Sequence, residues 1–143
     1  MPKGFRPDPR LEELKGEMAQ CKEEIASLRR EMDSLKGQKS YLWSQIEYLR
    51  TEISLEKSAL SQYCDAHKFL HSIGAYSDGY KNDIIDSKAR LDDLYGRIKP
   101  MYSELDGIKE KMQRVYEELC EKTALRDSIS ESYRERLAEI KGK

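Results

Sequence analysis

The chain has 143 residues, of which 37 % are charged and 38 % hydrophobic, with only 4 prolines and 8 glycines. This composition is typical of long helices and coiled coils, so a deep interior with a pocket for a small substrate is not expected. The formal net charge of -1 argues against a broad electrostatic surface for nucleic acid.

The apolar content also bears on compartment. No apolar run approaches the roughly 18 residues of a membrane-spanning helix, so no membrane insertion is expected. The three cysteines, Cys21, Cys64 and Cys120, are far apart and form no CxxC pair. An odd number of scattered cysteines is typical of reduced thiols in the cytosol, which predicts a cytoplasmic protein.

Residues 1–10 contain three of the four prolines together with Lys3, Arg6 and Arg10. We predict a flexible basic arm over these residues. The first helix is expected to start close to Asp8 or Pro9, because proline is tolerated in the first helical turn.

Residues 11–70 carry an alternating three-four spacing of apolar side chains, which predicts one long helix with a narrow apolar seam. Polar residues enter this seam only at Lys39, Glu56 and His67. The apolar seam residues are Leu11, Leu14, Met18, Cys21, Ile25, Leu28, Met32, Leu35, Leu42, Ile46, Leu49, Ile53, Leu60 and Tyr63.

Residues 71–82 break the repeat and contain Gly74 and Gly79, which predicts a turn. The same apolar spacing resumes in a second predicted helix over residues 83–142. Lys122 and Arg126 interrupt its seam, and Pro100 is expected to bend this helix rather than end it.

The two helical segments are nearly equal in length, with the turn midway between them. We therefore predict an all-α fold, a long antiparallel two-helix coiled-coil hairpin, over a parallel pair of extended chains. Two registers differ by one heptad. Apolar matching favours the one in which Leu60 faces Leu94 over the one in which Leu60 faces Ser87.

Basic residues recur along one flank of the first helix. They are candidates for binding RNA or an acidic surface, although glutamates alternate with them and ordinary flanking charges are the simpler interpretation. The candidates, with those of the arm, are Lys3, Arg6, Arg10, Lys15, Lys22, Arg29 and Lys36. A tyrosine row at Tyr95 and Tyr102 is expected to lie along the same flank of the hairpin.

Tyr41, Tyr48 and Leu55 recur every seven residues outside the seam, among small hydroxyl side chains. Such a line predicts a docking site for a third helix or a second hairpin, with Trp43 at its edge. Tyr76 and Tyr80 at the turn are further candidates for partner binding.

Chemistry-bearing motifs are absent from the sequence. It has no glycine-rich phosphate loop, no nucleophile-and-base motif and no HExxH, so no catalytic residue and no cofactor is expected. Cys64, His67 and His71 share a helix face without completing a four-ligand metal motif, and no metal site is predicted.

Three short stretches resemble the coiled-coil nuclear segregation or brefeldin A-resistance proteins and, more loosely, plant proton-pump interactors. The stretches are Arg6-Pro7-Asp8 leading into Leu11-Glu12-Glu13-Leu14, the run Leu94-Tyr95-Gly96-Arg97-Ile98-Lys99-Pro100, and Leu125-Arg126-Asp127-Ser128-Ile129. The resemblance implies a cytosolic, non-enzymatic protein associated with messenger ribonucleoprotein particles and polysomes.

These observations predict a non-enzymatic coiled-coil adaptor or scaffold associated with ribonucleoprotein particles or ribosomes. The alternative is a purely protein-binding tether of the vesicle-traffic, cytoskeletal or kinetochore type. Partners are expected to be other proteins, with homo-oligomerisation and contact with RNA or the ribosome left open.

Overall fold

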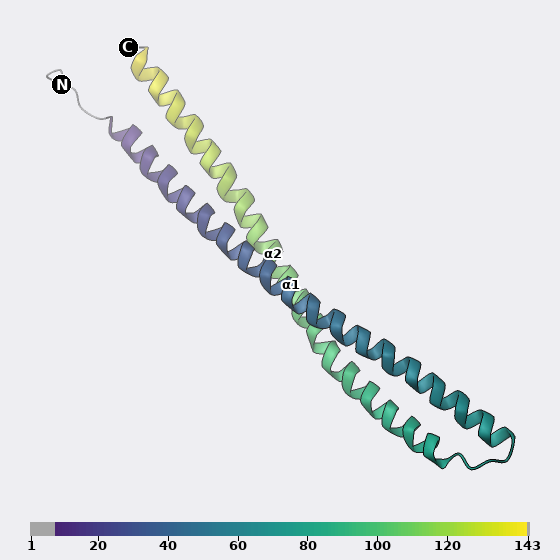
Figure 1. Cartoon of the computed structure of the whole chain (residues 1–143). Helices are drawn as coiled ribbons and strands as arrows, with labels where there is room; N and C mark the ends of the chain where they lie inside the picture. The colour runs from purple at the N-terminus through teal and green to yellow at the C-terminus, as the bar shows by residue number, and fades with distance from the viewer. Residues whose placement is uncertain (1–7, 143) are drawn as a thin grey trace. The chain divides into compact units, whose positions relative to one another are not determined.

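The computed structural model describes residues 8–142, nearly all of them in two α-helices. Helix α1 spans Pro9–Ser72 and helix α2 spans Asp78–Lys141, joined by a turn at residues 73–77 (Figure 1). No strand occurs among the described residues. The chain is all-α, and the two helices pack against each other as an antiparallel hairpin, which confirms the predicted fold class.

Two compact units make up the hairpin, and each contains one segment of each helix. The turn unit is Gln38–Lys109, and the terminal unit is formed by the described part of residues 1–37 with that of 110–143. The buried apolar residues of the turn unit are Leu42, Ile46, Leu49, Ile53, Leu91, Leu94, Ile98, Leu105 and Ile108. Those of the terminal unit are Leu14, Cys21, Ile25, Leu28, Leu35, Val115 and Ile129.

The seam of α1 lies where the sequence predicted it. From Leu11 to Tyr63, none of the predicted seam side chains is exposed. The polar entries Lys39, Glu56 and His67 are half-buried on the same stripe. A heptad pattern therefore specifies the buried face of this helix even where three of its positions are polar.

Helix α1 begins at Pro9 because Asp8 caps it. The Asp8 carboxylate Oδ1 accepts a hydrogen bond from the Arg10 backbone N–H at 2.8 Å, which satisfies a donor that the first turn leaves free. Arg10, expected in the arm, is thus helical. Lys3 and Arg6 lie outside the described residues.

The turn is shorter than the predicted 71–82. Gly74 has φ +72°, and its N–H donates to His71 C=O while Ala75 N–H donates to Leu70 C=O. These two bonds form the Schellman motif that ends α1. The Ser77 C=O already accepts a bond from Lys81 N–H at 3.2 Å, so α2 starts at Asp78 instead of residue 83.

Pro100 lies inside α2 on its exposed surface, and the helix continues through it. The sequence predicted that the helix would not end at Pro100. The structure agrees, because the missing N–H of Pro100 does not end α2.

The register favoured by apolar matching is wrong. In the turn unit, Ser87 Oγ donates to Glu56 Oε1 at 2.6 Å. In the terminal unit, Lys122 Nζ contacts Glu24 Oε2 at 2.6 Å. Both contacts belong to the alternative register, in which Leu60 faces Ser87.

Packing in the terminal unit agrees with this register. Leu14 clusters with Ile129, and Tyr133 packs against the same cluster. Ile140, which the apolar-matched register places opposite Leu14, is exposed. Ser87 and Lys122, two polar seam residues of α2, each find a carboxylate on α1 instead of being left unpaired, and this outweighs the better apolar matching.

Candidate docking surface

The strongest candidate site lies in the turn unit, along α1 beside its groove with α2. Tyr41, Tyr48 and Leu55 are 69 %, 64 % and 67 % exposed. They recur every second turn, which aligns them along the helix. We call these three residues the docking line. Large apolar side chains lined up on a surface mark an interaction site more often than isolated ones do.

Two neighbouring hollows between α1 and α2 accompany this line. The first, of about 270 Å³, holds Tyr41, Tyr48 and Leu49 of α1 against Arg97 and Met101 of α2. Its only charged lining side chain is Arg97. We call it the basic hollow.

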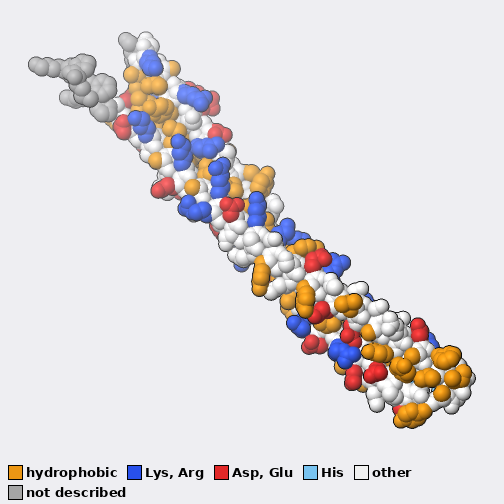
Figure 2. Space-filling view, in the orientation of Figure 1, with side chains coloured by type: hydrophobic (Ala, Val, Ile, Leu, Met, Phe, Trp, Pro, Cys, Tyr) orange, Lys and Arg blue, Asp and Glu red, His pale blue; other side chains and the backbone are white. Residues whose placement is uncertain are grey.

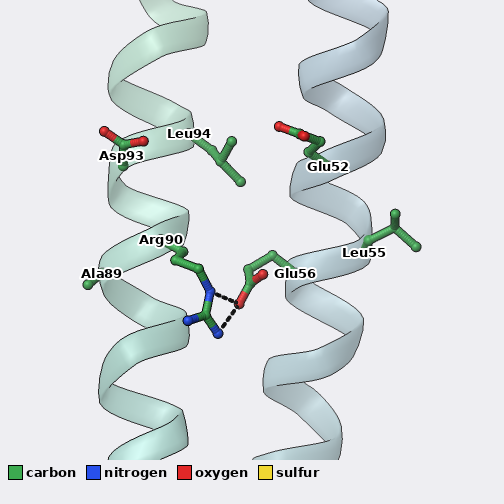
Figure 3. Close-up of a pocket in the computed structure, with 7 residues that line it drawn as sticks. All are labelled: Glu52, Leu55, Glu56, Ala89, Arg90, Asp93 and Leu94. Atoms are coloured by element: carbon green, nitrogen blue, oxygen red, sulfur yellow. Dashed lines mark hydrogen bonds and ion pairs between the residues drawn. The ribbon is translucent and has the colours of Figure 1, made fainter.

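The second hollow, of about 580 Å³, lies toward Leu55. Three carboxylates and one guanidinium line it, so its net charge is negative, and we call it the acidic hollow. Figure 3 shows Leu55 on the side of α1 that points away from α2. The lining residues are Glu52, Leu55, Glu56, Ala89, Arg90, Asp93 and Leu94.

Glu56 and Arg90 bind each other at the floor of the acidic hollow (Figure 3). Arg90 donates from both Nε and Nη2 to Glu56 Oε1 at 3.0 Å, and Ser87 donates to the same oxygen. These bonds lower the pKa of the Glu56 carboxyl, and the bond from Ser87 has the largest effect. Desolvation acts in the opposite direction. Glu56 is thus held as a carboxylate, and it supports the two helices rather than awaiting a ligand.

The tyrosine hydroxyls of the docking line have partners within the turn unit. Gln45 Nε2 donates to Tyr41 Oη at 2.9 Å. A hydrogen bond to the Glu52 carboxylate, and the charge of that carboxylate, raise the pKa of Tyr48. The Tyr48 hydroxyl is therefore paired within the chain, whereas the bond at Tyr41 uses the oxygen as an acceptor and leaves the O–H to bond solvent or a partner.

Other predicted partner-binding residues lie apart from the docking line. Trp43 is exposed but lines neither hollow. Tyr76 is 83 % exposed in the turn and Tyr80 lies in the first turns of α2. Figure 2 shows hydrophobic side chains gathered at this turn end of the turn unit.

The sequence interpretation missed Phe69, Ile73 and Ile85, which are also exposed near the turn. Phe69 had a detectable signal, because it continues the seven-residue spacing of the docking line after Gln62. The α2 residues of both hollows were missed because the wrong register placed other residues of α2 opposite the docking line.

In the turn unit, Tyr95 lies against Lys57, which continues the basic flank of α1 beyond the candidate residues named from the sequence. Lys57 Nζ lies 5.5 Å from the centroid of the Tyr95 ring. Arg50 and Tyr102 line a common hollow with this pair. The arrangement is a cation–π contact and belongs to the packing of the two helices.

The candidate basic row lies in the terminal unit. Arg10 pairs with Glu13 at 3.2 Å and Lys15 with Glu12 at 3.8 Å. The remaining members, Lys22, Arg29 and Lys36, are exposed, and no ion pair joins them to another residue between 8 and 142.

Near the turn, His67 and His71 stack with ring centroids 6.2 Å apart, and His67 Nδ1 lies 3.4 Å from Ser77 C=O. In the part of the chain that the structure describes, no three His, Cys, Asp or Glu side chains converge as metal ligands. Nor does any described helix combine the length and the apolar character needed to cross a membrane.

Comparison of the chain with protein-family models, with curated proteins and with solved structures finds no significant match.

Proposed function

We propose that this chain is a non-enzymatic, cytoplasmic adaptor or scaffold that binds another protein through the docking line of its turn unit. The observation that carries the proposal is the alignment of three large, mostly exposed apolar side chains beside two hollows. A helix laid along α1 would place its own side chains in these hollows, in the manner of helix-in-groove recognition.

The state of the docking line supports protein contact rather than catalysis. Tyr41 Oη already accepts a hydrogen bond from Gln45, and Tyr48 is paired with the Glu52 carboxylate, so a partner that covers the line has to supply an acceptor for the Tyr41 O–H. The carboxylate at the floor of the acidic hollow is likewise neutralised by Arg90.

Association with ribonucleoprotein particles or ribosomes is the second candidate function. The observation that favours it is the row of exposed cations Lys22, Arg29 and Lys36, which repeats every two turns, or about 10.5 Å. Such a row can contact phosphates, and the resemblance to nuclear segregation proteins points the same way. A purely structural tether requires no such contact.

Affinity purification of the tagged chain, with and without ribonuclease, tests these functions. The variants are Tyr48→Asp and the triple change Lys22→Glu, Arg29→Glu, Lys36→Glu. Tyr116→Asp is the matched control, because Tyr116 is an exposed tyrosine of the terminal unit.

If the docking proposal is right, a protein partner is recovered with and without ribonuclease. Of the three variants, only Tyr48→Asp abolishes its recovery. The ribonucleoprotein function expects ribosomal proteins that are lost with ribonuclease and with the triple change. Equal recovery of every partner by wild type and Tyr48→Asp would refute the docking line as the working surface.

A further inference from the structure

The two histidines of the chain lie together at the end of α1. His67 and His71 are the only histidines in the sequence, and they are four residues apart, which puts them on one face of a helix. Their rings stack with centroids 6.2 Å apart and an angle of 24° between the ring planes. The pair shares no residue with either hollow beside the docking line.

A hydrogen bond to the turn orients the first of these rings. His67 is half-buried, and its Nδ1 lies 3.4 Å from the Ser77 C=O. A carbonyl oxygen only accepts, so this bond requires the proton on Nδ1, and in the neutral imidazole it leaves the Nε2 lone pair free. Histidines that bind metals typically have their other ring nitrogen held by a carbonyl or a carboxylate in the same way.

The distance between the rings allows both to reach one metal ion. With a metal–nitrogen bond of about 2.0–2.1 Å, each ring centroid lies about 3.2 Å from the ion, and two rings on a tetrahedral ion have centroids about 5.2 Å apart. His71 is exposed, and rotation about its χ1 and χ2 can close the remaining gap of about 1 Å and turn its ring toward the ion.

The ligand type specifies the class of ion. Imidazole nitrogens bind Zn²⁺ and Cu²⁺, whereas Ca²⁺ and Mg²⁺ take oxygen ligands. Within residues 8–142, no third His, Cys, Asp or Glu side chain converges on the pair as a ligand. Water would therefore complete the coordination, as it does in metal sites that keep open positions.

We propose that His67 and His71 form a two-histidine site for a divalent transition-metal ion, Zn²⁺ or Cu²⁺. The ion would join side chains one turn apart at the end of α1, and the bond from His67 to Ser77 would tie them to the residue that precedes α2. The unfolded chain does not hold the two rings together, so the ion should bind the folded chain more tightly and stabilise it.

Isothermal titration calorimetry of the untagged full-length chain tests the site, with ZnCl2 and CuSO4 as probes and MgCl2 as the negative control. Cys64→Ser and Cys120→Ser provide the background protein, because these two thiols are not buried and can bind the same ions. We expect one Zn²⁺ or one Cu²⁺ per chain, and no Mg²⁺. His71→Gln should weaken the binding of both ions at least about tenfold, because a single imidazole cannot chelate.

A relocated histidine distinguishes a chelate from the mere presence of two imidazoles. Added to His71→Gln, Cys64→His places the second ring three residues from His67 on the same face of α1 and should restore binding. Phe69→His places it two residues from His67, on a different side of the helix, and should not restore binding.

Thermal melting gives an independent measurement. At a Zn²⁺ concentration about ten times the dissociation constant, the melting temperature of the background protein should rise by about 3–6 °C and fall back with EDTA. His71→Gln should abolish this rise, and circular dichroism without metal checks that the variant keeps its helices.

A background protein that binds neither ion, or that binds both ions equally well after His71→Gln, would overturn this inference. Neither result bears on the docking line, whose test is the loss of a protein partner with Tyr48→Asp.

Discussion

Glu56 shows how one side chain specifies the alignment of two helices. It occupies a seam position of α1, and its carboxylate accepts bonds from Ser87, which is fully buried, and from Arg90. Buried polar groups add little net stability over apolar ones, but leaving either partner alone is costly. Shifting α2 by one heptad would separate these partners, and the polar cluster therefore selects the register.

The difference between seam and surface is sharpest at two neighbouring residues of α1. Ile46 is 0 % exposed, whereas Tyr48 is on the docking line. Ile46→Asp should destabilise the turn unit by at least about 3 kcal/mol, because it buries an unpaired charge. Tyr48→Asp should leave the helical circular dichroism signal and the melting temperature nearly unchanged.

Thermal melts of both variants check this prediction. If the two variants lost helicity equally, Tyr48 would belong to the core, and the face assignment of α1 would be refuted.

At the scale of the elements, the end of α1 depends on one glycine. Gly74 has φ +72°, a conformation that a side chain disfavours, and Gly74→Ala should destabilise the hairpin by about 1 kcal/mol. The matched control is Gly96→Ala in the interior of α2, where an added Cβ meets nothing within 4 Å. That change should stabilise the protein by about 0.5–1 kcal/mol. Urea unfolding of both variants measures the two changes in unfolding free energy, which should have opposite signs.

The register itself can be tested by removing its polar determinants. Replacing Glu56, Ser87 and Lys122 together by leucine makes the seam apolar at these positions. We expect the triple variant to populate the apolar-matched register, displaced from the native one by one heptad, about 10.5 Å along the helix. Distances between spin labels, one on each helix of the turn unit, should change from one population to two.

Ser87→Ala alone is the control for this experiment. It removes one donor but leaves the Glu56–Arg90 ion pair, so a single distance population is expected. A triple variant that also keeps a single native distance would show that the turn, not the polar seam residues, specifies the register.

The sequence was sufficient for the helices, the buried stripe of α1 and the exposed line at Tyr41, Tyr48 and Leu55, because each follows from local periodicity. It was not sufficient for the pairing of the two helices. Apolar matching treats Ser87 and Lys122 as defects, whereas in the structure each finds a carboxylate partner on α1. This error hid Arg97 and the other α2 residues of the hollows, so only the α1 half of the docking surface was predicted.

Across the whole molecule, ion pairs link α1 and α2 in both units. Glu56 pairs with Arg90 in the turn unit, and Glu24 pairs with Lys122 in the terminal unit. The bond from Lys122 lowers the pKa of Glu24, and bonds from Ser87 and Arg90 lower that of Glu56, each below its ordinary value of 4.5. In both carboxyls the native state therefore favours the ionised form.

Acid should weaken this protein through these two groups. A carboxyl with a lowered pKa in the folded state contributes stability above about pH 5 and loses it as the pH falls through the folded-state value. The double variant Glu24→Gln, Glu56→Gln should be less stable than the wild type at pH 7, and the difference should shrink as the pH falls below about 5. Urea unfolding across this pH range measures the free energy of unfolding of both proteins.

Glu23→Gln with Glu104→Gln, at exposed positions, is the control expected to follow the wild type. A constant difference between the double variant and the wild type at every pH would show that these carboxylates act through packing and not through charge.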